Sequence, residues 1–186
     1  MAQIKNLKTP LTNDDLKNLR VGDKITLTGA IYSARDAAHK RIVELIDKHE
    51  KLPFDLQGAA VYYVGPSPAK PGYAIGSAGP TTSGRMDAYT PLLISKGLKG
   101  MIGKGPRSAE VKQAMKQHGA VYFAAVGGAG ALISKSITKS EVVAYPELGA
   151  EAIRRMEVKE LPLIVAIDMF GNDLYETGKE AYKQSA

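Results

Sequence analysis

The sequence predicts an α/β domain in which at least some strands pair in parallel. Apolar, strand-like runs alternate with helix-like segments from residue 59 to residue 170, an order typical of parallel sheets. No repeat of fixed period and no low-complexity linker divides the 186 residues, and that length suits one domain. We therefore expect a single domain over 1–186, with an extended N-terminal arm at 1–20 and a polar tail at 179–186.

Seven strands are expected, because each segment is a short apolar run or alternates apolar with polar residues. They cover residues 21–29, 59–64, 73–75, 99–102, 120–126, 140–144 and 161–169. In the first, Ile25 and Leu27 alternate with polar side chains, as in a half-buried strand. The runs at 59–64 and 120–126 are apolar throughout, which is typical of strands buried on both faces. Residues 66–72 contain three prolines and predict a loop.

Helical segments separate most of these strands. They begin near residues 14, 33, 83, 108, 131 and 147. Ser33 and Asp36 form a capping-box pair at the second start, and apolar residues then recur on one helical face. Ser108 caps a later helix, which ends at Gly119.

The composition excludes several classes of site. The chain has no cysteine, so it forms no disulfide and offers no thiolate to zinc or an iron–sulfur cluster. Its three histidines include no His-x-x-x-His pair, and no metal site is expected. The chain contains no run of about 18 apolar residues, the length needed to span a membrane. Its first residues lack the apolar core of a secretory signal. We expect a cytoplasmic protein without a membrane partner.

The net charge of +6 raises the question of nucleic acid. The basic residues are spread along the chain and mixed with 19 acidic ones. We therefore favour a generally basic surface and expect no nucleic-acid partner. A basic pocket for an anionic substrate is a second interpretation, compatible with the first.

The most unusual stretch is Gly79-Pro80-Thr81-Thr82-Ser83-Gly84-Arg85-Met86-Asp87. It predicts a loop that leads into a helix at Ser83, with a restart at Thr90-Pro91. Free N–H groups at a helix start favour an anion, and Arg85 adds a planar fork that matches a carboxylate or a phosphate. We expect this loop to bind an anionic small molecule, with Asp87 supporting Arg85. The alternative is an ordinary capped helix after a Gly-Pro turn.

Two glycine-rich segments fail the patterns of nucleotide-binding loops. Leu98 stands where a phosphate loop needs its first glycine, and Gly105 stands where it needs serine or threonine. After the Gly127–Gly130 run, Ile133 occupies the last glycine position of the dinucleotide pattern. A nucleotide ligand is not predicted.

Three cations, Arg35, Arg85 and Lys104, lie in loops that follow predicted strands. Loops at the carboxyl ends of parallel strands gather at one edge of the sheet, so we expect these cations and the Gly127–Gly130 turn to converge. Two arginines and a lysine suit a ligand with two anionic groups, such as a dicarboxylate. The alternative is that each cation is a solvated surface residue.

Three further side chains are candidates. His39 lies one turn after Arg35 and can face the same pocket, although a lone helical histidine is more often at the surface. Asp36 is interpreted first as a capping residue. Asp168 ends an apolar strand before a Gly-Asn turn, the position of a functional acid or of a turn cap.

These motifs resemble the β-subunit, or C-terminal domain, of the iron–sulfur-dependent class I fumarate hydratases and of the related L-tartrate dehydratases. The resemblance is carried by Gly79–Asp87, Gly103-Lys104-Gly105, Ala34–His39, and Ile167-Asp168 with Gly171-Asn172, and extends from about Leu11 to Gly178. Gly84 and Asp87 favour the fumarase branch. The family implies a swivelling β/β/α domain with a mixed sheet.

The resemblance also implies an activity and roles for residues. The activity is reversible hydration of fumarate to (S)-malate, with a 4Fe-4S cluster on a partner α-subunit, none on this chain, and an α2β2 assembly. Arg35, Arg85, Lys104 and Thr82 are then expected to bind the substrate carboxylates. Thr81 is expected to act as the base or only to position the substrate. The alternatives are a tartrate dehydratase β-subunit and a non-catalytic dicarboxylate- or anion-binding module.

Overall fold

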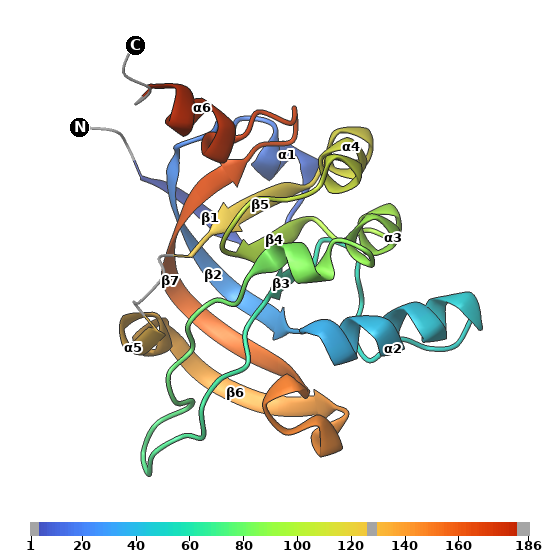
Figure 1. Cartoon of the computed structure of the whole chain (residues 1–186). Helices are drawn as coiled ribbons and strands as arrows, with labels where there is room; N and C mark the ends of the chain where they lie inside the picture. Colours follow the sequence, from blue (N-terminus) through green and yellow to red (C-terminus); the bar gives the residue numbers. More distant parts are fainter. Residues whose placement is uncertain (1–3, 126–129, 182–186) are drawn as a thin grey trace.

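The computed structural model describes residues 4–125 and 130–181 (Figure 1). Its strands are β1 (Lys5–Lys8), β2 (Lys24–Ser33), β3 (Ala60–Tyr62), β4 (Gly100–Gly103), β5 (Val121–Ala124), β6 (Ile137–Ala144) and β7 (Ile153–Ile167). Its α-helices are α1 (Asn13–Leu16), α2 (Asp36–Asp47), α3 (Thr90–Ser95), α4 (Ala109–His118), α5 (Gly130–Ile133) and α6 (Leu174–Ala181). Three 3₁₀ helices are η1 (Ser83–Met86), η2 (Ser134–Ser136) and η3 (Pro146–Glu151). Within these residues, no helix combines the length and the apolar character needed to cross a membrane.

The strands form one mixed sheet that β7 closes on itself. The order is β1-β2-β3-β4-β5-β7-β6, and β2 pairs in addition with β7. Strands β1 to β5 are parallel to their neighbours, whereas β7 is antiparallel to β2, β5 and β6. With 15 residues, β7 reaches both β2 and β5 and gives a barrel-like sheet, with α2, α3 and α4 on one side (Figure 1). The predicted α/β fold with a mixed sheet is confirmed.

Two apolar clusters share the central strands. One contains Ala60 and Tyr62 of β3 and no residue of α2, α3 or α4. The other contains Val61, on the opposite face of β3, together with side chains of those helices such as Ala38 and Met115. Because successive side chains of a strand point to opposite faces, the first cluster fills the barrel and the second lies beneath the helices. This explains why the central strands are apolar throughout.

Pairing within the sheet overrides three local predictions. Residues 5–8 of the predicted arm form β1, which lies beside β2. Ser33 belongs to β2 and does not cap a helix: its hydroxyl accepts a hydrogen bond from Arg154 N–H at 3.0 Å and donates to the Ala152 carbonyl at 3.2 Å. The N-cap of α2 is Arg35, which makes no side-chain capping bond. Much of the helix expected from residue 147 is η3, after which β7 begins.

The remaining differences concern loops and ends. Residues 73–75 form no strand and follow a turn in which Gly72 has a φ of 83°. The helix expected from Ser83 is the four-residue η1, and α3 begins separately at Thr90 with the predicted proline in its first turn. The caps of α4 at Ser108 and Gly119 are confirmed. Residues 179–181 belong to α6 rather than to a tail, and 182–186 lie outside the described residues. A single domain over 1–186 stays a prediction.

Candidate functional site

The carboxyl ends of β2, β3 and β4 lie side by side, because these parallel strands are neighbours in the sheet. Arg35 and Asp36 come just after β2, and Lys104 comes directly after β4. Thr81 reaches the same edge, since its N–H donates to the Tyr63 carbonyl at the end of β3 at 2.8 Å. The structure therefore brings these loops to one edge of the sheet. The first three residues of the Gly127–Gly130 turn lie outside the described residues.

Asp36 lies between the two candidate arginines. Its Oδ1 is 2.9 Å from Arg85 Nε, and its Oδ2 is 3.7 Å from Arg35 Nη2. Asp36 is the first residue of α2 and Arg85 lies in η1, so the ion pairs connect the helix after β2 to the threonine-containing loop. Arg85 is half exposed, whereas one fifth of the Arg35 side chain is exposed.

Arg35 is held from two further sides. Its Nη2 lies 3.3 Å from Oε1 of Glu151, whose Oε2 accepts a hydrogen bond from the Ala37 N–H at the start of α2. Gly65 packs against the guanidinium: a Cβ there would be 2.8 Å from Arg35 Nη1 and 3.3 Å from the Ala150 carbonyl oxygen. A side chain at position 65 would require the Arg35 guanidinium to move, so this glycine leaves the space that Arg35 occupies.

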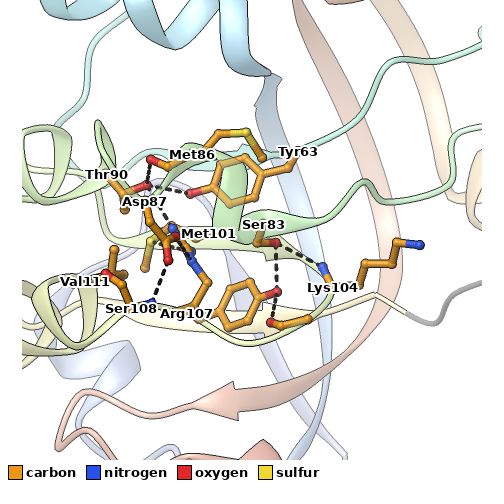
Figure 2. A network of polar contacts seen from close by, with 12 residues as sticks. Tyr63, Ser83, Met86, Asp87, Thr90, Met101, Lys104, Arg107, Ser108 and Val111 are labelled. Carbon is orange, nitrogen blue, oxygen red and sulfur yellow. Dashed lines mark hydrogen bonds and ion pairs between the residues drawn. The ribbon is translucent and has the colours of Figure 1, made fainter.

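The threonine segment takes the place of β3 beside the extension of β4. Thr82 pairs with Lys104 in a parallel bridge, and the Ser83 N–H donates to the Lys104 carbonyl at 2.9 Å. Figure 2 shows Ser83 turned inward and the Lys104 side chain pointing away from the network. Thr81 is half-buried, and Thr82 and Lys104 are exposed. The threonines and the lysine expected to contact an anion are thus at least partly accessible at this edge of the sheet, which we call the rim and which carries Arg35, Asp36, Thr81, Thr82, Arg85 and Lys104.

The predicted helix start at Ser83 is not an anion site of the expected kind. The helix η1 has only four residues, too few for an appreciable dipole. The Ser83 N–H is already bonded to Lys104. Positive charge at the rim therefore comes from the side chains of Arg35, Arg85 and Lys104. These three cations exceed the negative charge of the neighbouring carboxylates, Asp36 and Glu151.

Asp87 and Arg107 form a buried ion pair that was not predicted from the sequence. Asp87 does not support Arg85: its Oδ1 accepts from Arg107 Nε at 2.6 Å and its Oδ2 from the Ser108 N–H at 2.6 Å. The Arg107 side chain is fully buried and donates to Thr90 Oγ1 at 2.9 Å (Figure 2). Its guanidinium also lies over the Tyr63 and Tyr122 rings. An ion pair between residues that are far apart in the sequence produces no periodic pattern from which it could be predicted.

His39 belongs to the core beneath the site, not to its surface. It is fully buried, with its ring edge-on to Tyr63. Its Nδ1 donates to the Arg35 carbonyl at 2.9 Å, and its Nε2 has no hydrogen-bond partner within the described residues. Burial, with a smaller contribution from the charge of Arg107, lowers the pKa of His39 from 6.5 to about 4, against the opposing effects of the Arg35 carbonyl and Asp36. The ring is neutral at pH 7.

Asp168 caps a turn. It is fully buried, and its carboxylate accepts hydrogen bonds from the N–H groups of Phe170 and Asn172 and from the Asn172 side chain, at 3.0, 3.1 and 2.8 Å. These bonds all lie within the turn, so the contacts of Asp168 are those of a turn cap. Over 4–125 and 130–181, no group of three His, Cys, Asp or Glu side chains is placed to hold a metal ion.

Comparison with known proteins identifies the family. The family model described as "Fumarase C-terminus" matches residues 2–178. "Fumarate hydratase 2" of Leishmania major is 41% identical over 174 residues, which are 91% of this chain and 31% of the relative. "Fumarate hydratase class I, anaerobic" of Escherichia coli (strain K12) is 43% identical over 163 residues, or 87% of this chain and 30% of the relative.

A third relative has nearly the same length. "Putative L(+)-tartrate dehydratase subunit beta" of Methanocaldococcus jannaschii is 40% identical over 181 residues, which cover 94% of this chain and 93% of the relative. The chain therefore spans about 30% of the fumarate hydratases it matches and nearly all of this subunit. With the family model matching almost the whole sequence, the chain belongs to the fumarase C-terminus family.

Proposed function

We propose that this chain is the β-subunit of a two-subunit hydro-lyase that interconverts fumarate and (S)-malate. Its relatives from Leishmania major and Escherichia coli are named fumarate hydratases, and the relative of similar length is named a subunit. The observation that carries the proposal is the pair of arginines joined by Asp36, beside Thr81 and Lys104 at one sheet edge.

The three cations suit a dicarboxylate. Arg35 and Arg85 present guanidinium groups, which bind carboxylates through paired N–H donors, and Lys104 adds a third charge from the neighbouring loop. When the proton leaves the carbon next to a carboxylate, negative charge builds up on that carboxylate. Fixed cations stabilise this charge without reorganisation. We assign carboxylate binding to Arg35, Arg85, Lys104 and Thr82.

The proton is assigned to Thr81. In the direction of dehydration, (S)-malate loses a proton from one carbon and its hydroxyl from the next, and the electron pair of the broken C–H bond forms the double bond. Thr81 lies at the rim among cations, where its hydroxyl can relay the proton. A threonine hydroxyl is a weak base at its ordinary pKa, so it needs a second proton acceptor, which we assign to the partner subunit.

This chain's own residues do not fit an iron–sulfur cluster. It has no cysteine, and thiolates are the usual ligands of such clusters. We therefore propose that the 4Fe-4S cluster of this family is bound by a partner α-subunit in an α2β2 assembly in the cytoplasm.

A tartrate dehydratase β-subunit is the second candidate, since the Methanocaldococcus jannaschii relative of matching length carries that name. Both candidates require the same carboxylate contacts. Assay of the assembled enzyme with fumarate, malate, L-tartrate and a methylated fumarate separates them. A non-catalytic anion-binding module is the remaining alternative.

The proposal is tested with the chain co-expressed with its cluster-bearing partner. Thr81→Ala is expected to lower kcat by about 100-fold or more with little change in KM, as for loss of a proton-transfer group. Arg85→Lys is expected to raise KM and lower kcat, because lysine cannot bind a carboxylate through two donors. Near wild-type kcat in Thr81→Ala would remove the role of Thr81. Absence of hydratase activity in every assembly, with dicarboxylate binding retained, would favour the non-catalytic module.

A further inference from the structure

Ser83 joins the two loops that carry the proposed substrate contacts. Its N–H donates to the Lys104 carbonyl at 2.9 Å, and its Oγ accepts from the Lys104 N–H at 3.1 Å. Both backbone polar groups of Lys104 are thus satisfied by one residue. Ser83 is fully buried, so its hydroxyl does not contact substrate itself.

The Ser83 hydroxyl occupies the space that a side chain at position 103 would need. A Cβ on Gly103 would lie 2.0 Å from Ser83 Oγ and 3.3 Å from Ser83 Cβ. The serine of the Gly-Pro-Thr-Thr-Ser motif therefore packs directly on the glycine that precedes Lys104. The two motifs therefore meet in one contact, and a side chain at position 103 would overlap the Ser83 hydroxyl and press on the Tyr63 ring, whose Cδ2 is 3.0 Å from the same Cβ.

Two tyrosines complete the enclosure of this contact. The Tyr122 hydroxyl lies 2.8 Å from Ser83 Oγ and 3.0 Å from the Gly105 carbonyl oxygen. The Tyr122 hydroxyl has one proton, which it donates to the Gly105 carbonyl. The Ser83 hydroxyl then donates to the Tyr122 oxygen, and both hydroxyl groups have partners. Burial raises the pKa of Tyr122 well above its ordinary value, so this donor stays protonated. On the other side, the Gly105 N–H donates to the Tyr175 hydroxyl at 3.0 Å.

We propose that Ser83 is a positioning residue that fixes Lys104 relative to Thr81 and Thr82, with Tyr122 holding the Ser83 hydroxyl in place. The inference rests on the proposed function, because it assigns to Lys104 a contact with substrate. The backbone of Lys104 is fixed on both sides, so its flexible side chain starts from a defined point at the rim. Fixing that point reduces the ordering needed when the dicarboxylate binds.

The test is a double-mutant cycle in the enzyme assembled with its partner subunit. Ser83→Ala is expected to raise KM for malate about tenfold, the size associated with one lost hydrogen bond, with a smaller change in kcat. In the Lys104→Met background the same change is expected to alter KM by less than about twofold, because the residue it positions is gone. Ser95→Ala is the matched control: this exposed serine donates only to the Leu92 carbonyl, and KM should be unchanged.

A second arm separates packing from positioning. Gly103→Ala is expected to lower the Tm, and adding Ser83→Ala should restore part of that loss by removing the overlapping hydroxyl. KM in the double variant should nevertheless stay as high as in Ser83→Ala. If Ser83→Ala does not assemble, Tyr122→Phe replaces it in the cycle, with a smaller rise in KM and the same dependence on Lys104. Tyr73→Phe, at an exposed tyrosine, is its control.

The possible failures are distinguishable. If Lys104→Met raises KM but neither Ser83→Ala nor Tyr122→Phe does, the positioning role is overturned and the proposed function stands. If Ser83→Ala raises KM equally with and without Lys104, it acts by another route, and the inference is again overturned. If Lys104→Met leaves KM unchanged, the substrate contact of Lys104 fails, and this inference fails with it.

Discussion

Asp36 and Arg85 form an ion pair, with Oδ1 and Nε 2.9 Å apart, and Arg35 approaches the other oxygen of the same carboxylate at 3.7 Å. One acid therefore sets the relation between two arginines that come from different loops. It also screens part of their mutual repulsion, which two cations in the partly buried rim would otherwise feel. Under the proposed function, a substrate carboxylate would meet arginines that are already partnered, and the ion pair with Asp36 would orient Arg85.

Asp36→Asn is expected to lower kcat/KM for malate about tenfold, because it removes the charged partner that orients Arg85 while keeping the side-chain shape. The measurement is steady-state kinetics of the assembled enzyme. Asp47→Asn is the control, since Asp47 is the exposed last residue of the same helix and its change should leave kcat/KM within about twofold. A higher kcat/KM in Asp36→Asn would mean that Asp36 competes with substrate rather than orienting Arg85.

Glu151→Gln is expected to raise KM about three- to tenfold with little change in thermal stability. Glu151 contacts Arg35 at 3.3 Å and the Ala37 N–H at 3.2 Å, and glutamine keeps an acceptor for only one of them. The pair is partly exposed, so its effect on folding is small. Glu147→Gln is the control, because Glu147 lies in the same 3₁₀ helix but pairs with Arg41. Equal KM values for the two variants would contradict the assignment.

Arg107→Met is expected to lower the free energy of unfolding by about 3–5 kcal/mol, because it leaves the Asp87 carboxylate without its buried partner. Denaturant unfolding of the isolated chain measures this. Lys17→Met removes a cation from the pair of Lys17 with Asp14, in which both side chains are largely exposed, and should cost less than about 1 kcal/mol. Similar losses in the two variants would show that the Arg107 pair is not the buried network described above.

Stability is expected to fall as the pH drops from 6.5 to about 4, in part through His39. The pKa of His39 is lowered to about 4 in the folded chain, so between these values the unfolded chain binds a proton that the folded chain does not. Stability therefore rises with pH through this window, by about 3 kcal/mol for a shift of this size. His39→Gln should flatten the pH profile of the unfolding free energy. An unchanged slope in His39→Gln would contradict the buried, neutral ring.

Much of the fold was predictable because the central strands and α4 carry strong local signals. The apolar run before Gly65 and the Ser108 and Gly119 caps lie where the sequence predicted them. β1 was missed because Leu7 alone is buried among Lys5, Asn6 and Lys8, which gives too short an alternation. Ser33 has the local pattern of a cap, but its bonds to Ala152 and Arg154 of the distant β7 segment prevail.

For the site, the placement of loops was predictable and the partners within it were not. Parallel strand order alone brings Arg35 and Lys104 to one edge. The partner of Arg35, Glu151, lies in η3, which connects β6 to β7 and brings the Glu151 carboxylate to the start of α2. That contact depends on the pairing of β7 with β2, which is distant in the sequence. Likewise, Arg107 is next to a predicted helix cap, and nothing nearby in the sequence shows that it is buried against Tyr63 and Tyr122.

The position of β7 late in the sequence bears on the order of events during translation. Arg35, Arg85 and Lys104 are all synthesised before the strand that closes the sheet. Ser33, the last residue of β2, has both hydrogen-bond partners of its hydroxyl at Ala152 and Arg154. A nascent chain that stops before Ile153 contains every residue proposed to contact the substrate. It lacks β7, the strand that pairs with both β2 and β5. Ribosome-bound chains of increasing length should therefore acquire protease resistance around Arg35 only after β7 has left the exit tunnel.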